Sequence, residues 1–141
     1  MTGRGGRDGG LRKCYRTHLP EIHWTSVESP FTIQGIPDSN FCHDGVEGWI
    51  ENKRVRRADV VEMRPEQVAW IERRARAGGR VFIAVRWAMQ ADSLFLLAPQ
   101  AGRALLGLGL ASLPRAMVLG RWSGGPSQWK WPKIAEILLY S

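Results

Sequence analysis

The sequence predicts an α/β fold in which helices flank a mixed central sheet of four to five strands. One observation is an Asp44-Gly45 pair between two strand-like runs, which is a strong signal for a β-hairpin. Another is a helical pattern over residues 65–77 that precedes an apolar, strand-like run over residues 80–87. A helix that connects two strands usually makes them parallel neighbours. We therefore expect the 80–87 strand to lie beside the second strand of the hairpin.

The helix over residues 65–77 has clear boundary signals, because Pro65 suits a first turn and Gly78-Gly79 is typical of a helix end. The remaining predicted elements are a helix over residues 11–19, extended segments over 22–27 and 31–33, a strand over 93–97, and helices over 99–106 and 132–140. Residues 113–128 have no clear pattern. A length of 141 residues favours one domain over residues 11–141, after a flexible, basic Gly/Arg-rich tail over residues 1–10.

The hairpin brings two acidic residues to face each other. With the Asp-Gly pair as a two-residue turn, the register pairs Asp38 with Glu51, and Lys53 points to the same side. A three-residue turn would shift Asp38 by one place and lose this pairing. The opposite face carries apolar side chains that can enter a core: Phe41, Val46 and Ile50. Two carboxylates with an ammonium beside them indicate a divalent-cation site, and an ordinary surface salt-bridge cluster is the alternative.

The spacing of these residues resembles a known signature. Pro37-Asp38, followed after a twelve-residue gap by Glu51-Asn52-Lys53, is similar to the PD-(D/E)xK nuclease motif. Within that superfamily the chain most resembles the small phage VRR-type and Holliday-junction-resolvase-like nucleases. The resemblance covers residues 10–97 and includes the Gly-Ile-Pro-Asp lead-in, the Gly-Trp-Ile-Glu strand and a following helix that contains Gln67.

The resemblance implies a restriction-endonuclease-like fold and a metal-dependent DNA endonuclease, with branched or structured DNA as a candidate substrate. Asp38 and Glu51 would hold Mg²⁺, or Mn²⁺ as a substitute, and the backbone carbonyl of Asn52 would be a further ligand. Lys53 would orient or help to deprotonate the attacking water and offset charge on the phosphate. Gln67 would approach the active site and substrate, although an ordinary half-exposed helix glutamine fits the pattern equally well.

The sequence departs from the family in two places. The family usually adds an acidic residue from its first helix, but the predicted helix over residues 11–19 contains none. Asp8 is the closest positional match, and Glu21 and Glu28 are alternatives, so the number of metal ions stays open. Asn52 stands where an apolar residue is more common.

A net charge of +7 favours a polyanionic partner, most simply nucleic acid, or an anionic membrane surface. Three arginines that directly follow Lys53 are predicted to bind DNA phosphates: Arg54, Arg56 and Arg57. A solvated basic rim is the alternative interpretation. A homodimer would suit branched DNA, which generally needs two active sites, but no pattern identifies an interface.

Other readings of the sequence compete with a nuclease. A non-catalytic nucleic-acid-binding protein with a nuclease fold is the main alternative. Tryptophans near the C-terminus can stack bases or simply pack in the core: Trp122, Trp129 and Trp131. A zinc site would have to use residues that lack the usual paired spacing: Cys14, His18, His23, Cys42 and His43.

Features that relate to location favour a cytoplasmic protein, and the resemblance to phage nucleases suggests a phage-encoded protein that acts in the host cell. Two cysteines fit a reducing compartment, and the first ten residues lack the apolar stretch of a secretory signal. The most apolar segment, residues 104–119, is too short and too interrupted by Gly and Pro to span a membrane. We therefore expect no membrane partner.

Overall fold

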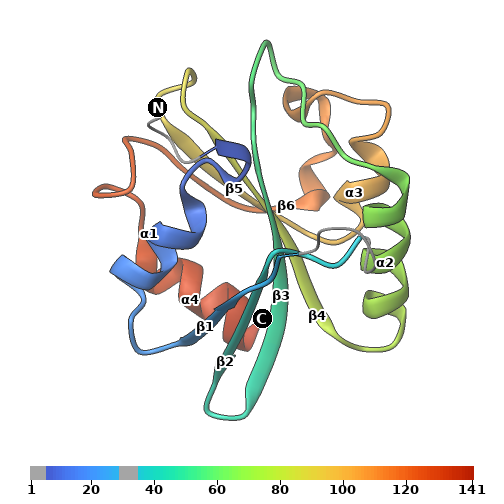
Figure 1. The fold of residues 1–141 in the computed structure, drawn as a ribbon. Coiled ribbons are helices and arrows are strands. Elements are labelled where there is room, and N and C mark those ends of the chain that lie inside the picture. Colours follow the sequence, from blue (N-terminus) through green and yellow to red (C-terminus); the bar gives the residue numbers. More distant parts are fainter. Residues whose placement is uncertain (1–5, 29–34) are drawn as a thin grey trace.

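The computed structural model describes residues 6–28 and 35–141. Within those residues, one mixed sheet contains six strands, whose order across the sheet follows their order along the chain (Figure 1). The strands are β1 (His23–Ser26), β2 (Ser39–His43), β3 (Val46–Arg54), β4 (Arg80–Trp87), β5 (Ser93–Leu97) and β6 (Val118–Trp122). Neighbouring strands are antiparallel except for β3 and β4, which are parallel. The α/β class and the parallel placement of the 80–87 strand are therefore confirmed.

The predicted number of four to five strands is wrong, because the described residues form six. The strand that sequence reasoning missed is β6, which lies within the patternless segment 113–128. Gly120 and Arg121 interrupt its apolar character, and it is an edge strand that pairs only with β5. Such a strand depends on its neighbour rather than on its own pattern. The other extended segment, residues 31–33, lies outside the described residues.

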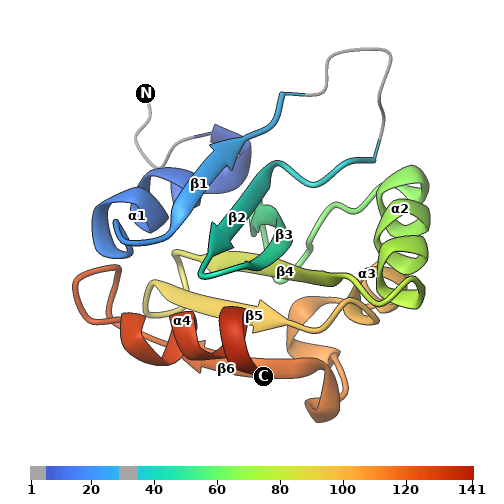
Figure 2. The same cartoon turned by 90° about the horizontal axis from the view of Figure 1, so that it is seen from below.

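Helices cover both faces of the sheet. α1 (Leu11–His18) and α4 (Trp131–Tyr140) lie on one face, and α2 (Pro65–Arg76) and α3 (Ala101–Ala104) lie on the other (Figure 1, Figure 2). Short 3₁₀ helices are η1 (Gly6–Asp8), η2 (Leu110–Ser112) and η3 (Arg115–Met117). A separate hydrophobic core fills each face. No helix in the described part of the chain is both long and apolar enough to cross a membrane.

The hairpin register is the predicted one. Asp44 and Gly45 both have positive φ, 50° and 80°, as a tight two-residue hairpin turn requires. β2 and β3 pair Cys42 with Glu47 and Asn40 with Trp49, so Asp38 immediately precedes the first paired residue, Ser39. Phe41 and Ile50 are completely buried in the core under α1 and α4, and Val46 packs against it. The opposite side of β3 is therefore free to carry Glu51 and Lys53.

The helix predicted over residues 65–77 is present as α2. Pro65 is its first residue, and the side-chain oxygen of Gln67 accepts a hydrogen bond from the Arg64 N–H at 3.0 Å, which caps the first turn. The helix ends before Gly78, whose φ is +92°. The helix predicted over residues 99–106 is shorter, and only Ala101–Ala104 is helical.

Residues 6–10 are not the flexible tail that their glycines predict. η1 packs against β3, and Asp8 is only 6% exposed. The Gly9 carbonyl accepts a hydrogen bond from Arg86 on β4. The polar contacts of Asp8 and Arg86 hold this segment in place, which a composition argument does not capture. Residues 1–5 lie outside the described residues.

The C-terminal tryptophans pack in the core rather than line a surface. Trp129 and Trp131 are 3% and 7% exposed, and Trp122 packs partly against the same core. The indole N–H groups of Trp129 and Trp131 donate to backbone carbonyls. These two rings are therefore not available to stack on bases.

Candidate active-site cleft

A cleft of about 940 Å³ contains the residues that the nuclease motif singles out. Its walls come from η1, α1, β3 and the start of α2. All the predicted catalytic and metal-binding residues line it: Asp38, Glu51, Asn52, Lys53 and Gln67. Further charged residues line it too: Asp8, Arg12, Glu28, Glu62 and Arg64. The hairpin and α2 therefore bring the motif residues into one site, although they span thirty positions of the chain from residue 38 to residue 67.

Three side chains on the α2 face form a connected cluster. Gln67 donates from Nε2 to Glu51 Oε2 at 3.1 Å and accepts from Lys53 Nζ at Oε1, 3.0 Å away. Lys53 Nζ also lies 3.5 Å from Glu51 Oε2. Gln67 and Glu51 are 6% and 5% exposed, so the glutamine is buried rather than half-exposed. Because its oxygen accepts from Lys53 and from the Arg64 N–H, its amide nitrogen must face the carboxylate.

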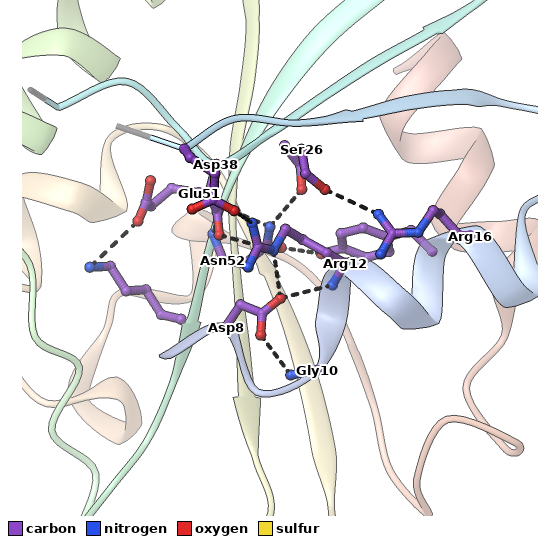
Figure 3. A network of polar contacts seen from close by, with 12 residues as sticks. Asp8, Gly10, Arg12, Arg16, Ser26, Asp38, Glu51 and Asn52 are labelled. Atoms are coloured by element: carbon purple, nitrogen blue, oxygen red, sulfur yellow. Dashed lines mark hydrogen bonds and ion pairs between the residues drawn. The ribbon is translucent and has the colours of Figure 1, made fainter. Parts of the chain in front are cut away.

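Asp38 is held differently, by donors from a neighbouring strand. Its Oδ1 accepts from the Asn52 backbone N–H at 3.0 Å and from the Asn52 side-chain Nδ2 at 2.9 Å. Its Oδ2 lies 3.9 Å from Arg12 Nε. Figure 3 shows the Arg12 guanidinium between Asp8 and Asp38. Oδ2 is thus the atom of Asp38 that remains for a ligand in the cleft.

The side chain of Asn52 points to the α1 face, away from Glu51, as the alternation of β3 predicts. Its Nδ2 also donates to Ser39 Oγ at 2.9 Å, and its Oδ1 accepts from the Tyr15 hydroxyl at 2.5 Å. A metal ligand from this residue would therefore be the backbone carbonyl and not the side chain. Sequence reasoning missed Tyr15, because nothing in the pattern of the first helix shows that its hydroxyl would reach β3.

The acids proposed to complete the site have different positions. Asp8 lines the cleft, but its carboxylate accepts from the Gly10 and Arg12 backbone N–H groups and from Arg12 Nε at 3.0 Å (Figure 3). Glu28 also lines the cleft and pairs with Arg12 Nη1 at 3.1 Å. Glu21 is not among the cleft residues, and its backbone carbonyl contacts the His43 ring. Arg12, which sequence reasoning did not identify, thus binds the carboxylates of both Asp8 and Glu28.

Burial and nearby carboxylates raise the pKa of both motif acids. Burial raises the pKa of Glu51 to about 7, and the charge of Asp38 adds to this rise against the attraction of Lys53. Burial also raises the pKa of Asp38, whereas the Asn52 backbone hydrogen bond and the Arg12 charge oppose the rise. A cation between the two carboxylates would favour the charged form of both.

The candidate ligands, which are all oxygen atoms, fit a hard divalent cation that prefers oxygen ligands and keeps some of its bound water. Two carboxylates and a carbonyl are the kind of partial ligand set that Mg²⁺ uses in phosphate enzymes, and Mn²⁺ accepts the same oxygen ligands. Among the described residues, no group of three or more His, Cys, Asp or Glu side chains is placed to hold a metal. The zinc hypothesis for Cys14, His18, His23, Cys42 and His43 therefore has no support in the structure.

The arginines predicted to bind DNA do not line the cleft. Arg56 and Arg57 are exposed in the loop that follows β3. Arg54 is half-buried, and its Nε is buried without a hydrogen-bond partner among the described residues. Arg12 and Arg64 are the arginines that flank the motif carboxylates, together with Arg7 at the rim.

No known protein-family model matches the sequence, and no curated protein gives a match either. The resemblance to PD-(D/E)xK nucleases therefore depends on the motif. Any functional assignment has to be argued from the residues of the cleft.

Proposed function

We propose that this protein is a metal-dependent DNA endonuclease whose active site is the cleft described above. The observation that carries the proposal is the grouping of Asp38, Glu51 and Lys53 in one cleft, with Gln67 bonded to the last two. A chance match to so short a motif gives no reason for its residues to converge. The buried polar cluster is also costly to the fold, which favours a functional reason for keeping it.

Phosphodiester hydrolysis needs a positioned water and positive charge near the phosphate as negative charge develops. A Mg²⁺ ion held by Asp38 and Glu51 would supply that charge and make the attacking water more acidic. Lys53 would lie beside the same phosphate and stabilise the charge that builds up in the transition state. Gln67 would hold Lys53 and Glu51 at a fixed separation, so that neither side chain has to reorganise during the reaction.

DNA is the proposed substrate because the chain is basic and the cleft carries arginines. The net charge is +7, and Arg12 and Arg64 lie on the cleft wall where backbone phosphates would pass. Arg56 and Arg57, exposed beyond β3, would contact phosphates farther from the cut. The proposal has three more specific parts. The substrate is branched DNA, the active form is a homodimer, and the protein acts in the cytoplasm of a phage host.

A second candidate function is a nucleic-acid-binding protein without catalysis. One observation favours it: the Asp8 carboxylate accepts hydrogen bonds from Gly10 and Arg12. These bonds compete with a role for Asp8 as a third metal ligand. Such a protein would bind DNA equally well with and without Mg²⁺ and would leave it intact.

The test is incubation with supercoiled plasmid, linear duplex and a four-way junction, with Mg²⁺ and with EDTA. We expect cleavage only with Mg²⁺, and loss of both cleavage and Mg²⁺ binding in Asp38→Asn. Asp44→Asn is the matched control, because Asp44 lies exposed in the hairpin turn and asparagine tolerates its positive φ. Undiminished cleavage by Asp38→Asn would rule out the proposed active site, and binding without cleavage by the wild type would favour the second candidate.

A further inference from the structure

A chain of buried hydrogen bonds connects α1 to Asp38. The Tyr15 hydroxyl donates to Asn52 Oδ1, and Asn52 Nδ2 donates to Asp38 Oδ1 and to Ser39 Oγ. Tyr15 and Asn52 are 2% and 3% exposed, so solvent cannot replace these bonds. A buried asparagine in a central strand is costly unless all its hydrogen-bonding atoms have partners, and here each has one.

The partners of Asn52 fix which way its amide faces. An ionised Asp38 only accepts hydrogen bonds, so the amide nitrogen must point toward it. The amide oxygen then points toward α1 and needs a donor there, which is the Tyr15 hydroxyl. Without that donor the oxygen would be buried unsatisfied, and a flipped amide would place oxygen against the carboxylate. Tyr15 therefore determines how the Asn52 amide faces Asp38, although Tyr15 itself makes no hydrogen bond to Asp38.

The consequence is an asymmetric carboxylate. Asp38 Oδ1 accepts from both nitrogens of Asn52, whereas Oδ2 accepts no hydrogen bond from the described residues and has Arg12 Nε 3.9 Å away, so Oδ2 is the oxygen left for a ligand. The contacts of Glu51 within the described residues likewise use one oxygen, Oε2. We propose that Tyr15 and Asn52 are positioning residues that hold Asp38 in the orientation that presents Oδ2 as a single-oxygen ligand for the divalent cation. This inference rests on the proposed function, because it concerns the same cation.

A simpler arrangement competes with this inference. The Asn52 backbone N–H alone, at 3.0 Å from Asp38 Oδ1, could hold the carboxylate, and the buried side chains would then serve only the stability of the fold. The two cases differ in what the Tyr15 hydroxyl does. A purely structural role predicts lower stability with unchanged cation affinity, whereas a positioning role predicts weaker binding in a protein that remains folded.

The experiment is a calorimetric Mg²⁺ titration of Tyr15→Phe, Asn52→Leu and the double variant, with folding checked by circular dichroism. Removing a residue that hydrogen-bonds a metal ligand typically costs about 10- to 100-fold in metal affinity, and we expect Asn52→Leu to fall in that range with a smaller loss for Tyr15→Phe. Because Tyr15 acts through Asn52, the double variant should bind no more weakly than Asn52→Leu alone. Ser93→Ala is the control, since it removes a buried hydroxyl on β5, outside the cleft residues.

Unchanged affinity in a folded Tyr15→Phe protein, or fully additive losses in the double variant, would overturn the inference. Tyr15→Phe keeps the ring and its stacking on Trp24, so it remains informative even if Asn52→Leu does not fold. If the wild type binds no Mg²⁺, the proposed function fails, and crystal structures of the metal-free proteins then decide the matter. Several Asp38 orientations in Tyr15→Phe would support positioning, and a single unchanged orientation would contradict it.

Discussion

The two carboxylates of the cleft are held in contrasting ways. Asp38 lies immediately before β2 and accepts hydrogen bonds from two nitrogens of Asn52, with Arg12 near its other oxygen. Glu51 lies within β3 and contacts a glutamine amide and a lysine ammonium. Its pKa of about 7 means that its charge changes near neutral pH. The contrast teaches that one motif can hold two acids of different character, because their surroundings and not their spacing set their protonation.

Removing the charge of Lys53 tests the surroundings of Glu51 and leaves those of Asp38 intact. Lys53→Ala should lower the cleavage rate about 100- to 1,000-fold, because it deletes charge placed for the transition state. DNA affinity should hardly change, since one phosphate contact among many is a small share of binding. Lys133→Ala is the control, because Lys133 is an exposed lysine on α4. Normal cleavage by Lys53→Ala would show that the Glu51 side is not catalytic.

A second prediction uses stability to sharpen the contrast. A carboxyl whose pKa is higher in the folded protein keeps its proton longer than in the unfolded chain. The free energy of unfolding should therefore fall as pH rises from about 4.5 to about 7 and then level off. At about 1.36 kcal/mol per pKa unit, a rise from 4.5 to about 7 corresponds to a total decrease on the order of 3 kcal/mol. Glu51→Gln should remove this decrease in metal-free protein, as urea unfolding at several pH values would measure.

Exposed Glu136 provides the matched control, and Glu136→Gln should retain the pH dependence of the wild type. The same dependence in Glu51→Gln as in the wild type would assign the titrating group elsewhere. Asp38 would then be the first residue to examine, because it is the other raised carboxyl of the cleft.

The third prediction concerns the cation. Mg²⁺ would bind the ionised form of Glu51, so its affinity should fall roughly tenfold for each pH unit below 7 and be nearly constant above 8. Calorimetric titrations between pH 5.5 and 8.5 would show this, in buffers of different ionisation enthalpy to count the protons released. Release of one proton per ion near pH 6 is the expected value. A pH-independent affinity would mean that Glu51 is not a ligand.

The sequence predicted the parts of the site that local rules control. The Asp44-Gly45 turn determines the hairpin register, and the periodicity of α2 places Gln67 near its start. Arg12 and Tyr15 could not be found this way, because their contacts with Asp38 and Asn52 join α1 to distant strands. Such contacts depend on how helices dock, which no local pattern encodes. For the same reason Asp8, in a glycine-rich segment, is expected to be mobile and instead accepts hydrogen bonds from Arg12 on α1.

The smallest expected effect compares the loop with the cleft. Replacing Arg56 and Arg57 by glutamine should weaken DNA binding modestly and reduce the dependence of log affinity on log salt by about 2, if each contacts one phosphate. Arg64→Gln should lower both affinity and cleavage, because Arg64 lies on the cleft wall. Fluorescence titrations of a labelled duplex at several salt concentrations would measure the slopes. An unchanged slope in the loop variant would make that loop a solvated rim.

Through Gln67, fraying of the first turn of α2 is coupled to loss of the contacts within the site. The Gln67 oxygen that accepts from Lys53 also accepts from the N–H of Arg64, the residue immediately before α2, so one side chain serves both. Whenever the first turn of α2 frays, Lys53 and Glu51 lose their shared partner in the same event. The Arg64 amide should therefore exchange its hydrogen for deuterium at a rate that reports how often the site disassembles. A ligand that bridges Glu51 and the substrate would stabilise the contact between Glu51 and Gln67. It should therefore slow exchange of the Arg64 amide without contacting that amide.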